Sequence, residues 1–296
     1  MRLGVNVPNF GPGTTPDSFD EWAELGEELG LDLLAVSDHV VVTPDVAGHY
    51  PAPFYDALTT LAYLAGTTDT VRLGTTILVV PYRHPLQTAR VTATLDQLAR
   101  GRLVLGVGVG WAAQEFAALG LDHARRGALT DEALATILEA WSTPVLPDGV
   151  ATAPAPAQRP RPPVWVGGDG DSPVAIRRTV RFGLTWHPLH PTLAGIRDRQ
   201  LPRLRHLADR AGVPVPDVAP RLALRLRPTP AGGGDERTLG TGTLAQVVAD
   251  VEALAALGIA DVMLDPYDVA LAARGAGPDH VSARADVTSV ARAVLG

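Results

Sequence analysis

The feature that most constrains the fold of this chain is a regular alternation of short apolar segments with longer amphipathic ones. Eight short segments are rich in β-branched residues: Leu3–Val7, Leu33–Ser37, Arg72–Val79, Leu103–Gly108, Val164–Gly167, Gly183–Trp186, Arg221–Arg227 and Asp261–Leu264. The other segments carry apolar residues at helical spacing: Asp17–Leu29, Phe54–Gly66, Pro85–Ala99, Thr130–Trp141, Thr192–Ala211, Thr243–Leu257 and Ala283–Leu295. Apolar strands that alternate with helices indicate a parallel sheet covered on both faces. Eight such units favour a closed (β/α)8 barrel of the α/β class over an open sheet, because no glycine fingerprint follows the first strand.

The 296 residues suit one barrel domain that spans residues 1–296. Four stretches break the alternation, and we expect loop insertions at about residues 40–53, 142–163, 228–240 and 271–281. The first, third and fourth follow the carboxyl ends of strands, where barrel enzymes carry their chemistry. These three loops are therefore candidate walls or lids of a site.

The composition excludes several classes of chemistry. The chain has no cysteine, and all 25 of its basic residues are arginine. Thiolate nucleophiles, zinc–thiolate sites and Schiff-base lysines are therefore excluded. The net charge of −7 disfavours nucleic acid and anionic membranes as partners. Because there is no membrane-spanning apolar run and no signal-peptide pattern, we expect a soluble, cytoplasmic protein whose partner is a small molecule.

A glycine-rich run ends the fourth predicted strand. Gly106, Gly108 and Gly110 alternate with valines before Trp111. Glycine allows backbone to approach a ligand closely, so one interpretation is a planar ligand that rests on this strand end. The alternative is a bulged strand in the core.

Two further strand ends carry ionisable side chains. Asp38 and His39 close the second strand, which places them at the active face of a barrel. His39 is either a general acid or base or a structural brace of the loop. Arg83 lies just before a helix that Pro85 opens. It is expected either to help that helix end attract an anion or to form a salt bridge across the rim.

The fifth predicted strand leads into a glycine-rich turn. Gly167, Gly168 and Gly170 could present a nest of backbone N–H groups to a phosphate. Asp169 and Asp171 weaken this interpretation, since carboxylates repel phosphate, and they could instead cap the helix that follows.

A metal site is a further alternative at the sixth strand. His187 and His190 are three residues apart, and Asp265 follows the eighth strand. Metal-dependent barrel hydrolases usually carry a His-x-His pair on the first strand, and residues 5–7 of this chain offer none.

Taken together, these segments resemble the bacterial luciferase-like family, and within it the oxidoreductases that depend on the deazaflavin coenzyme F420. The resembling residues run in order over about the first 190 positions: 36–39 (VSDH), 72–75 (RLGT), 81–85 (PYRHP), 93–98 (ATLDQL), 101–102 (GR) through 110–111 (GW), 115–120 (EFAALG), 126–127 (RG), 130–132 (TDE) and 162–168 (PPVWVGG). The remaining residues match only in pattern.

The resemblance implies a deazaflavin ring stacked at the carboxyl ends of the barrel strands. It implies a non-proline cis peptide behind the ring, for which the matching bond is Thr76–Ile77. His39 is the implied acid or base near the reactive carbon. The implied cofactor contacts are Asp38, Thr76, Ile77, Val79, Val109, Gly110, Gln114, Gly167, Gly168 and Gly170.

One departure from the family pattern concerns the substrate. Sugar-phosphate dehydrogenases of the family carry a catalytic Glu where this chain has Trp111, which argues for an apolar or aromatic substrate. We expect Tyr50, Trp111, Trp186 and His187 to contact it.

The leading hypothesis is hydride transfer between F420 and a small substrate, with His39 handling the proton. The alternatives are an FMN-dependent luciferase-like monooxygenase, a flavin-binding protein without activity and a metal hydrolase. A homodimer is expected only because dimers are common in the family.

Overall fold

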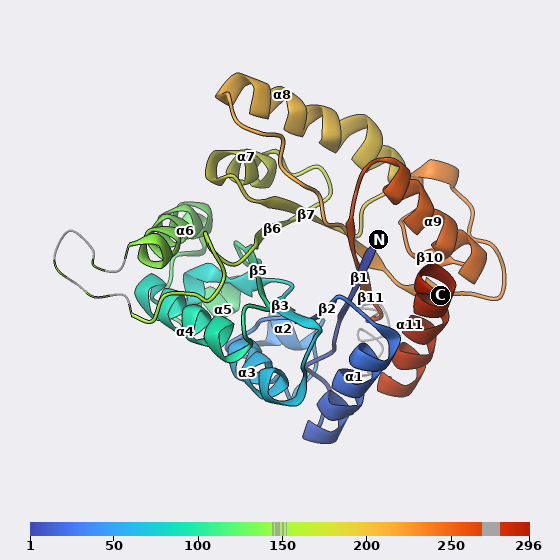
Figure 1. Cartoon of the computed structure of the whole chain (residues 1–296), viewed down its shortest axis with the longest axis horizontal. Coiled ribbons are helices and arrows are strands. Elements are labelled where there is room, and N and C mark those ends of the chain that lie inside the picture. The colour runs from blue at the N-terminus through green and yellow to red at the C-terminus, as the bar shows by residue number, and fades with distance from the viewer. Residues whose placement is uncertain (144, 146–148, 150, 152, 268–278) are drawn as a thin grey trace.

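The computed structural model describes residues 1–143, 145, 149, 151, 153–267 and 279–296 (Figure 1). The strands are β1 (Arg2–Asn6), β2 (Leu33–Val36), β3 (Arg72–Thr75), β4 (Leu78–Val79), β5 (Leu103–Gly108), β6 (Val164–Asp169), β7 (Thr185–Leu189), β8 (Arg221–Ala223), β9 (Arg225–Leu226), β10 (Thr241–Gly242) and β11 (Asp261–Asp265). The main sheet has the order β3-β2-β1-β11-β8-β7-β6-β5-β4, and a pairing of β3 with β5 closes it into a ring. Its pairings are parallel, so the predicted (β/α)8 barrel is confirmed. β9 and β10 form a separate pair.

Helices surround the strands, and the N-terminus lies in the middle of their ring in Figure 1. They are α1 (Pro16–Leu29), α2 (Pro44–Ala47), α3 (Ala57–Thr67), α4 (Pro85–Leu98), α5 (Ala113–Ala118), α6 (Arg126–Ser142), α7 (Pro173–Phe182), α8 (Leu201–Ala211), α9 (Leu244–Ala256) and α11 (His280–Leu295). Shorter turns are the 3-10 helices η1 (Val80–Tyr82), η2 (His123–Arg125) and η4 (Gly234–Glu236) and the π-helix η3 (Gly195–Gln200). Sequence signals mark several ends: Thr15 and Thr243 form capping boxes, and Gly30 ends α1 in the left-handed conformation.

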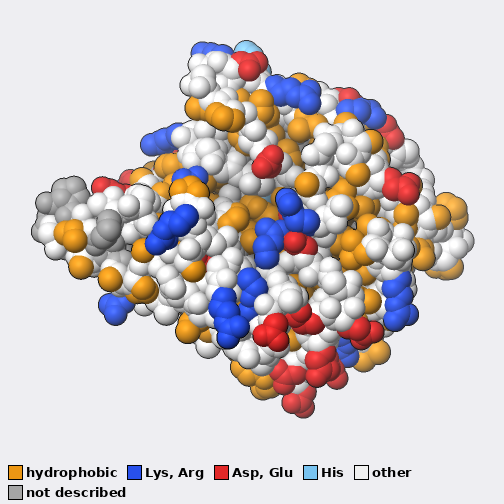
Figure 2. Space-filling view, viewed as in Figure 1, with side chains coloured by type: hydrophobic (Ala, Val, Ile, Leu, Met, Phe, Trp, Pro, Cys, Tyr) orange, Lys and Arg blue, Asp and Glu red, His pale blue; other side chains and the backbone are white. Residues whose placement is uncertain are grey.

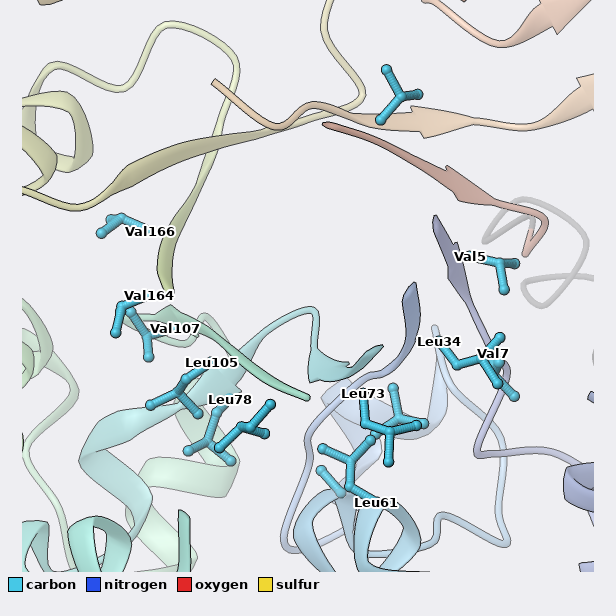
Figure 3. Packing of buried hydrophobic residues seen from close by; sticks show 14 of the residues in the cluster. Val5, Val7, Leu34, Leu61, Leu73, Leu78, Leu105, Val107, Val164 and Val166 are labelled. Carbon is cyan, nitrogen blue, oxygen red and sulfur yellow. The ribbon is translucent and has the colours of Figure 1, made fainter. Parts of the chain in front are cut away.

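The core has two layers. Outward-facing strand residues such as Leu73 and Leu105 pack against the helices, and Figure 3 shows Leu61 of α3 beside Leu73. A second, smaller cluster joins strands on opposite sides of the ring with Ala219, which lies just before β8. Its members are Leu33, Ala35, Val104, Trp165, Ala219 and Met263. These side chains fill the interior of the barrel, so the barrel is a packed core rather than a channel.

The third predicted strand, Arg72–Val79, is split by a bulge. Gly74 pairs with Val104, and Leu78 pairs with Val107. Between these two pairs the chain advances four residues along β3–β4 but only three along β5. β3–β4 therefore contains one extra residue, which defines a bulge. The bulge consists of residues 75–77 and ends the regular strand near the carboxyl end of the barrel.

The opposite, amino-terminal end of the strands carries ion pairs. Arg2 contacts Asp261 at 2.5 Å, and Arg72 pairs with Asp32 and with Asp261, the latter at 2.9 Å. Figure 2 shows basic side chains grouped near the middle of the viewed face, with acidic side chains at its lower edge. Acidic and basic side chains therefore both occur on this surface, which agrees with the modest net charge of −7.

The predicted loops differ from expectation in detail. Residues 40–53 contain the short helix α2, and residues 228–240 contain η4. Parts of the 142–163 loop and most of the 271–281 loop lie outside the described residues. The helix expected to begin at Ala283 begins at His280, because Asp279 caps it by accepting from the amides of Val281 and Ser282. Within the described ranges, no helix has both the length and the apolar character needed to cross a membrane.

Candidate active site

A cavity of about 840 Å³ opens at the carboxyl ends of the barrel strands. This is the face at which barrel enzymes place their chemistry, and the volume suits a cofactor-sized ligand. Its lining comes from the ends of β2, β4, β5, β6 and β7 and from the segments that follow them. The lining residues include Asp38, His39, His49, Tyr50, Thr76, Ile77, Val79, Gly108, Val109, Gly110, Trp111, Arg126, Gly167, Gly168, Asp169, Ser172, Arg178, His190 and Arg221.

His39 is held at the wall of this cavity by Glu115 from α5. The His39 Nδ1 atom lies 2.6 Å from Glu115 Oε2, and Oε1 of the same carboxylate accepts from the amides of Val40 and Val41 at 2.6 and 3.0 Å. Burial alone would raise the pKa of Glu115, but the hydrogen bonds from His39 and the two amides outweigh it and hold that pKa below its ordinary value. A buried anion is therefore fixed beside the predicted acid–base residue.

Asp38 is held by an arginine and a backbone amide. Arg83 donates to both of its oxygens at 2.7 and 2.8 Å and also reaches Asp56 at 2.9 Å. The amide of Val79 donates to Asp38 at 2.9 Å. Of the two interpretations of Arg83, the structure therefore bears out the salt bridge. This network joins the ends of β2 and β4 and fixes one side of the cavity.

The floor of the cavity is the bulge in β3–β4. The bond between Thr76 and Ile77 is cis, as the resemblance implied, and Ile77 faces the cavity. Arg221 donates to the Thr76 carbonyl oxygen at 2.6 Å and is itself paired with Asp265 at 2.7 Å. These contacts fix the carbonyl group of the floor peptide, and Arg221 itself also lines the cavity.

His187 belongs to this support and not to the predicted substrate wall. It is 0% exposed, its Nδ1 donates to the carbonyl of Ala219, and its Nε2 lies 2.9 Å from Thr76 Oγ1. Burial lowers its pKa to about 4, so it is neutral at physiological pH. The expectation that His187 contacts substrate is wrong, because its ring is fully buried, both of its nitrogens have protein partners, and it does not line the cavity.

Trp186 is a second correction. Its ring is fully buried, its Nε1 donates to Gln200 Oε1 at 2.9 Å, and it is not among the cavity-lining residues. An indole at a strand end can point into the helix layer as readily as toward the ligand, and here it packs beneath the backbone of Gly168. Gln114, an expected cofactor contact, also lies off the cavity and exchanges hydrogen bonds with Asp45.

Gly106 and Gly108 of β5 pack closely against residues 75–77 of the neighbouring strand, and Gly108 and Gly110 also line the cavity. A Cβ atom on Gly108 would lie 2.5 Å from Ile77 Cδ1, and one on Gly167 would lie 2.5 Å from Ile77 Cγ2. A Cβ on Gly106 would overlap the carbonyl oxygen of Thr75. Gly106 therefore fits the interpretation of a core strand, although the bulge lies in the neighbouring β3–β4 and not in β5, whereas Gly108 also lines the cavity. Gly110, at φ +76°, still lines the cavity.

The predicted phosphate turn faces the far end of the cavity. Gly167, Gly168 and Ser172 line it, whereas Gly170 does not. Ser172 caps α7, and neither Asp169 nor Asp171 does so; Asp171 instead pairs with Arg199 at 2.5 Å. The cationic side chains at this end are Arg126 and Arg178.

Arg178 is largely neutralised, whereas Arg126 has fewer partners. Arg178 pairs with Asp131 and donates to the Gly127 carbonyl at 3.1 Å. Arg126 donates one hydrogen bond, to the His123 carbonyl at 3.0 Å. Arg126 is therefore the better candidate for an anion at this end.

Aromatic side chains form the wall on the His39 side. Trp111 is 44% exposed, and its ring centroid lies 5.7 Å from that of His39 and 4.9 Å from that of His49. The ring of Tyr50 is 5.3 Å from that of His39. Trp111 and Tyr50 therefore stand where a substrate beside His39 would meet them, and their role stays a prediction.

Sequence reasoning missed Glu115 and Arg221 as site residues. Arg221 is a charged residue in an otherwise buried segment, and that was the available signal. Glu115 lies in α5, most of whose residues are exposed, so the sequence pattern carries no such signal for it. The metal alternative finds no support: within the residues that the structure describes, no group of His, Asp and Glu could hold an ion. His190 does contact Asp265 at 3.0 Å, but His187 is turned toward Thr76.

A closed parallel barrel with a His–Glu pair at its mouth defines a class of barrel enzyme, and comparison with known proteins identifies the family. Residues 1–232 match the luciferase-like monooxygenase family, and the chain belongs to it. An F420-dependent glucose-6-phosphate dehydrogenase from Kribbella flavida is 32% identical over 239 residues, which cover 76% of this chain and 69% of that one. Matches to several other curated relatives span only about half of their length, for example 41% and 55%.

Solved structures agree in fold. An F420-dependent secondary alcohol dehydrogenase in complex with an F420–acetone adduct superposes with a TM-score of 0.77 at 18% identity, over 99% of both chains. The monooxygenase RslO1 from Streptomyces bottropensis superposes with a TM-score of 0.71 at 23% identity, over 93% of this chain and 96% of that one. At these identities the likeness concerns the fold.

Proposed function

We propose that this protein is an oxidoreductase that uses coenzyme F420 to transfer a hydride to or from a small, apolar organic substrate. The observation that carries the proposal is the Glu115-anchored imidazole of His39 at the wall of a cofactor-sized cavity. The choice of F420 is supported by relatives at 32–38% identity whose names specify this coenzyme.

The residues around the cavity fit such a cofactor. Ile77 and Val79 offer an apolar surface to a planar ring, and Asp38 and His39 stand beside it. At the far end, Arg126 offers a cation to a phosphate. The start of α7 adds little to it, because Pro173 has no N–H group, the Ser172 amide donates to the Asp169 carbonyl, and the Ala175 amide donates to Ser172 Oγ. The exposed carboxylate of Asp169 lies at the same end and limits how much negative charge the site can accept.

A bound deazaflavin supplies a carbon that gives or takes a hydride, and its chemistry does not activate oxygen. His39 then handles the accompanying proton, because its ring lines the cavity and its Nδ1 atom is already engaged by Glu115. Asp38, fixed by Arg83, keeps the end of β2 in place. Trp111 and Tyr50 exclude water from the reacting centre.

The aromatic wall favours an apolar substrate over a sugar phosphate. Trp111 occupies the position at which the sugar-phosphate enzymes of the family carry an acid. Its neighbours His49 and Tyr50 extend the same face. Large, rigid rings bind apolar groups at low cost in conformational entropy, and none of the three carries a fixed charge for a phosphate.

Titration of the purified protein with F420 and, separately, with FMN tests the proposal. We expect the fluorescence of F420 to change when it binds. At a free F420 concentration about one hundred times Kd, binding should raise the free energy of unfolding by about 2.7 kcal/mol. Arg126→Glu should weaken F420 binding at least about tenfold through charge repulsion, which corresponds to about 1.4 kcal/mol. Arg125→Glu is the matched control, because that side chain is exposed and pairs with Glu132 at 3.5 Å, off the cavity. Binding of FMN without binding of F420 would replace this proposal with the FMN-dependent monooxygenase.

A further inference from the structure

Glu115 is a buried carboxylate whose two oxygens have separate partners. It is 0% exposed, and its Oε1 atom accepts from the amides of Val40 and Val41. Its Oε2 atom lies 2.6 Å from His39 Nδ1. The two oxygens therefore tie the loop after β2 and the imidazole to the same helix, α5.

This geometry determines where the proton of His39 sits. An ionised carboxylate only accepts hydrogen bonds, so the His39 Nδ1 atom must carry hydrogen to make the observed contact. In the neutral ring the other nitrogen, Nε2, then holds the lone pair. The tautomer ready to accept a proton is therefore selected before any ligand binds.

We propose that Glu115 is the positioning residue that fixes the Nδ1–H tautomer of His39 and thereby leaves its Nε2 atom ready to accept a proton from the substrate. The inference rests on the proposed function and adds the resting protonation state of its acid–base residue. If the substrate is oxidised, the proton that leaves it would pass to His39 Nε2, while the hydride with both electrons would pass to bound F420. In the reverse direction the imidazolium, stabilised by Glu115, would return that proton to the substrate.

The glutamine variant separates tautomer control from loop anchoring. In Glu115→Gln, the amide oxygen can still accept from Val40 and Val41 while the amide nitrogen donates to His39 Nδ1. That donation requires a lone pair on Nδ1, so hydrogen moves to Nε2 and the ring faces the cavity as a donor. A merely structural Glu115 would leave the tautomer unchanged in this variant.

Nitrogen-15 NMR of histidine-labelled protein without cofactor measures the tautomer directly. Spectra are recorded at about pH 8.5, about two units above the reference pKa of histidine, and the His39 signals are assigned from their loss in His39→Asn. We expect the Nδ1–H form in the native protein and a change of about tenfold or more in the tautomer ratio in Glu115→Gln. Asp45→Asn is the control, because Asp45 joins the same loop to α5 through the Gln114 amide at 3.0 Å without contacting His39.

Two results would overturn the inference: an Nε2–H tautomer in the native protein, or an unchanged tautomer in Glu115→Gln. Both are independent of the proposed function, since the spectra need no cofactor. If F420 does not bind but the tautomer inverts, the proposed function fails and the positioning role of Glu115 stands. If F420 binds to both proteins with equal affinity and the tautomer does not change, the opposite holds.

Discussion

Gly108→Ala tests whether the glycines of β5 are required by the side chain of Ile77. The new Cβ would lie 2.5 Å from Ile77 Cδ1 and 2.8 Å from Cγ1, closer than nonbonded carbons approach. Overpacking of this kind costs about 1–3 kcal/mol, and the loss of glycine freedom in the unfolded chain returns about 0.4–1 kcal/mol. We therefore expect a net destabilisation of about 1–2 kcal/mol and a decrease in Tm of about 2–4 °C for each kcal/mol.

A second substitution at Ile77 tests the cause of this loss. Ile77→Ala removes the atoms that clash and leaves only its Cβ, 3.6 Å from a Cβ added at Gly108 or at Gly167. In the double variant the two costs should not add, and the coupling energy should be about 1–3 kcal/mol, equal to the clash. Gly167→Ala should be relieved in the same way, because its clash is with Ile77 Cγ2 at 2.5 Å.

Gly106→Ala is the matched control on the same strand. Its Cβ would meet the backbone carbonyl of Thr75, and truncation of Ile77 cannot relieve that contact. Urea denaturation followed by tryptophan fluorescence gives the free energy of unfolding of each single and double variant. If the effects of Gly108→Ala and Ile77→Ala are additive, or if Gly106→Ala is rescued equally, the packing explanation is refuted.

Two further predictions concern buried polar contacts. Asp265→Ala should cost about 3–5 kcal/mol in urea denaturation, because it leaves the buried guanidinium of Arg221 without its carboxylate; a loss below about 1 kcal/mol would contradict this. His280 Nδ1 accepts from Trp22 Nε1 at 3.1 Å and so must be unprotonated, and burial lowers the pKa of His280. Its contribution to stability is therefore present above the unfolded-state pKa of about 6.5 and is lost as the pH falls through the lower folded-state pKa. His280→Leu should flatten the stability profile between about pH 7 and pH 5, and an equal slope in both proteins would be the contrary result.

The strand pattern predicted the barrel, but it could not reveal the bulge. Most of residues 72–79 are apolar or β-branched, so the segment is predicted as one strand. The extra residue becomes visible only in the register against β5, where Gly74 pairs with Val104 and Leu78 with Val107. Register depends on the partner strand, and a single segment does not contain that information.

The barrel pattern predicts a site at the strand ends where the cavity lies, but it does not predict the partners of the site residues. Asp38 and His39 follow β2, and their position at the cavity could be argued from the barrel alone. Their anchors, Arg83 and Glu115, are 45 and 76 residues away in the chain. The sequence leaves two interpretations open for Arg83, an anion site or a salt bridge, and it predicts no role for Glu115. A buried ion pair is recognised only when its two members are seen to lie close together in space.

The glycine run and the ligand hypothesis are connected through Ile77. Glycines at positions 108 and 167 leave room for that side chain, and the bulge brings it above them. Ile77 in turn presents an apolar surface to the cavity. The glycines of β5 and β6 therefore have two effects: they leave space for Ile77 in the neighbouring strand, and Gly108, Gly167 and Gly168 also line the cavity themselves. A larger residue at either glycine would push Ile77 toward the cavity, so ligand affinity and fold stability should change together in these variants, whereas Asp265→Ala acts from behind the floor on stability first.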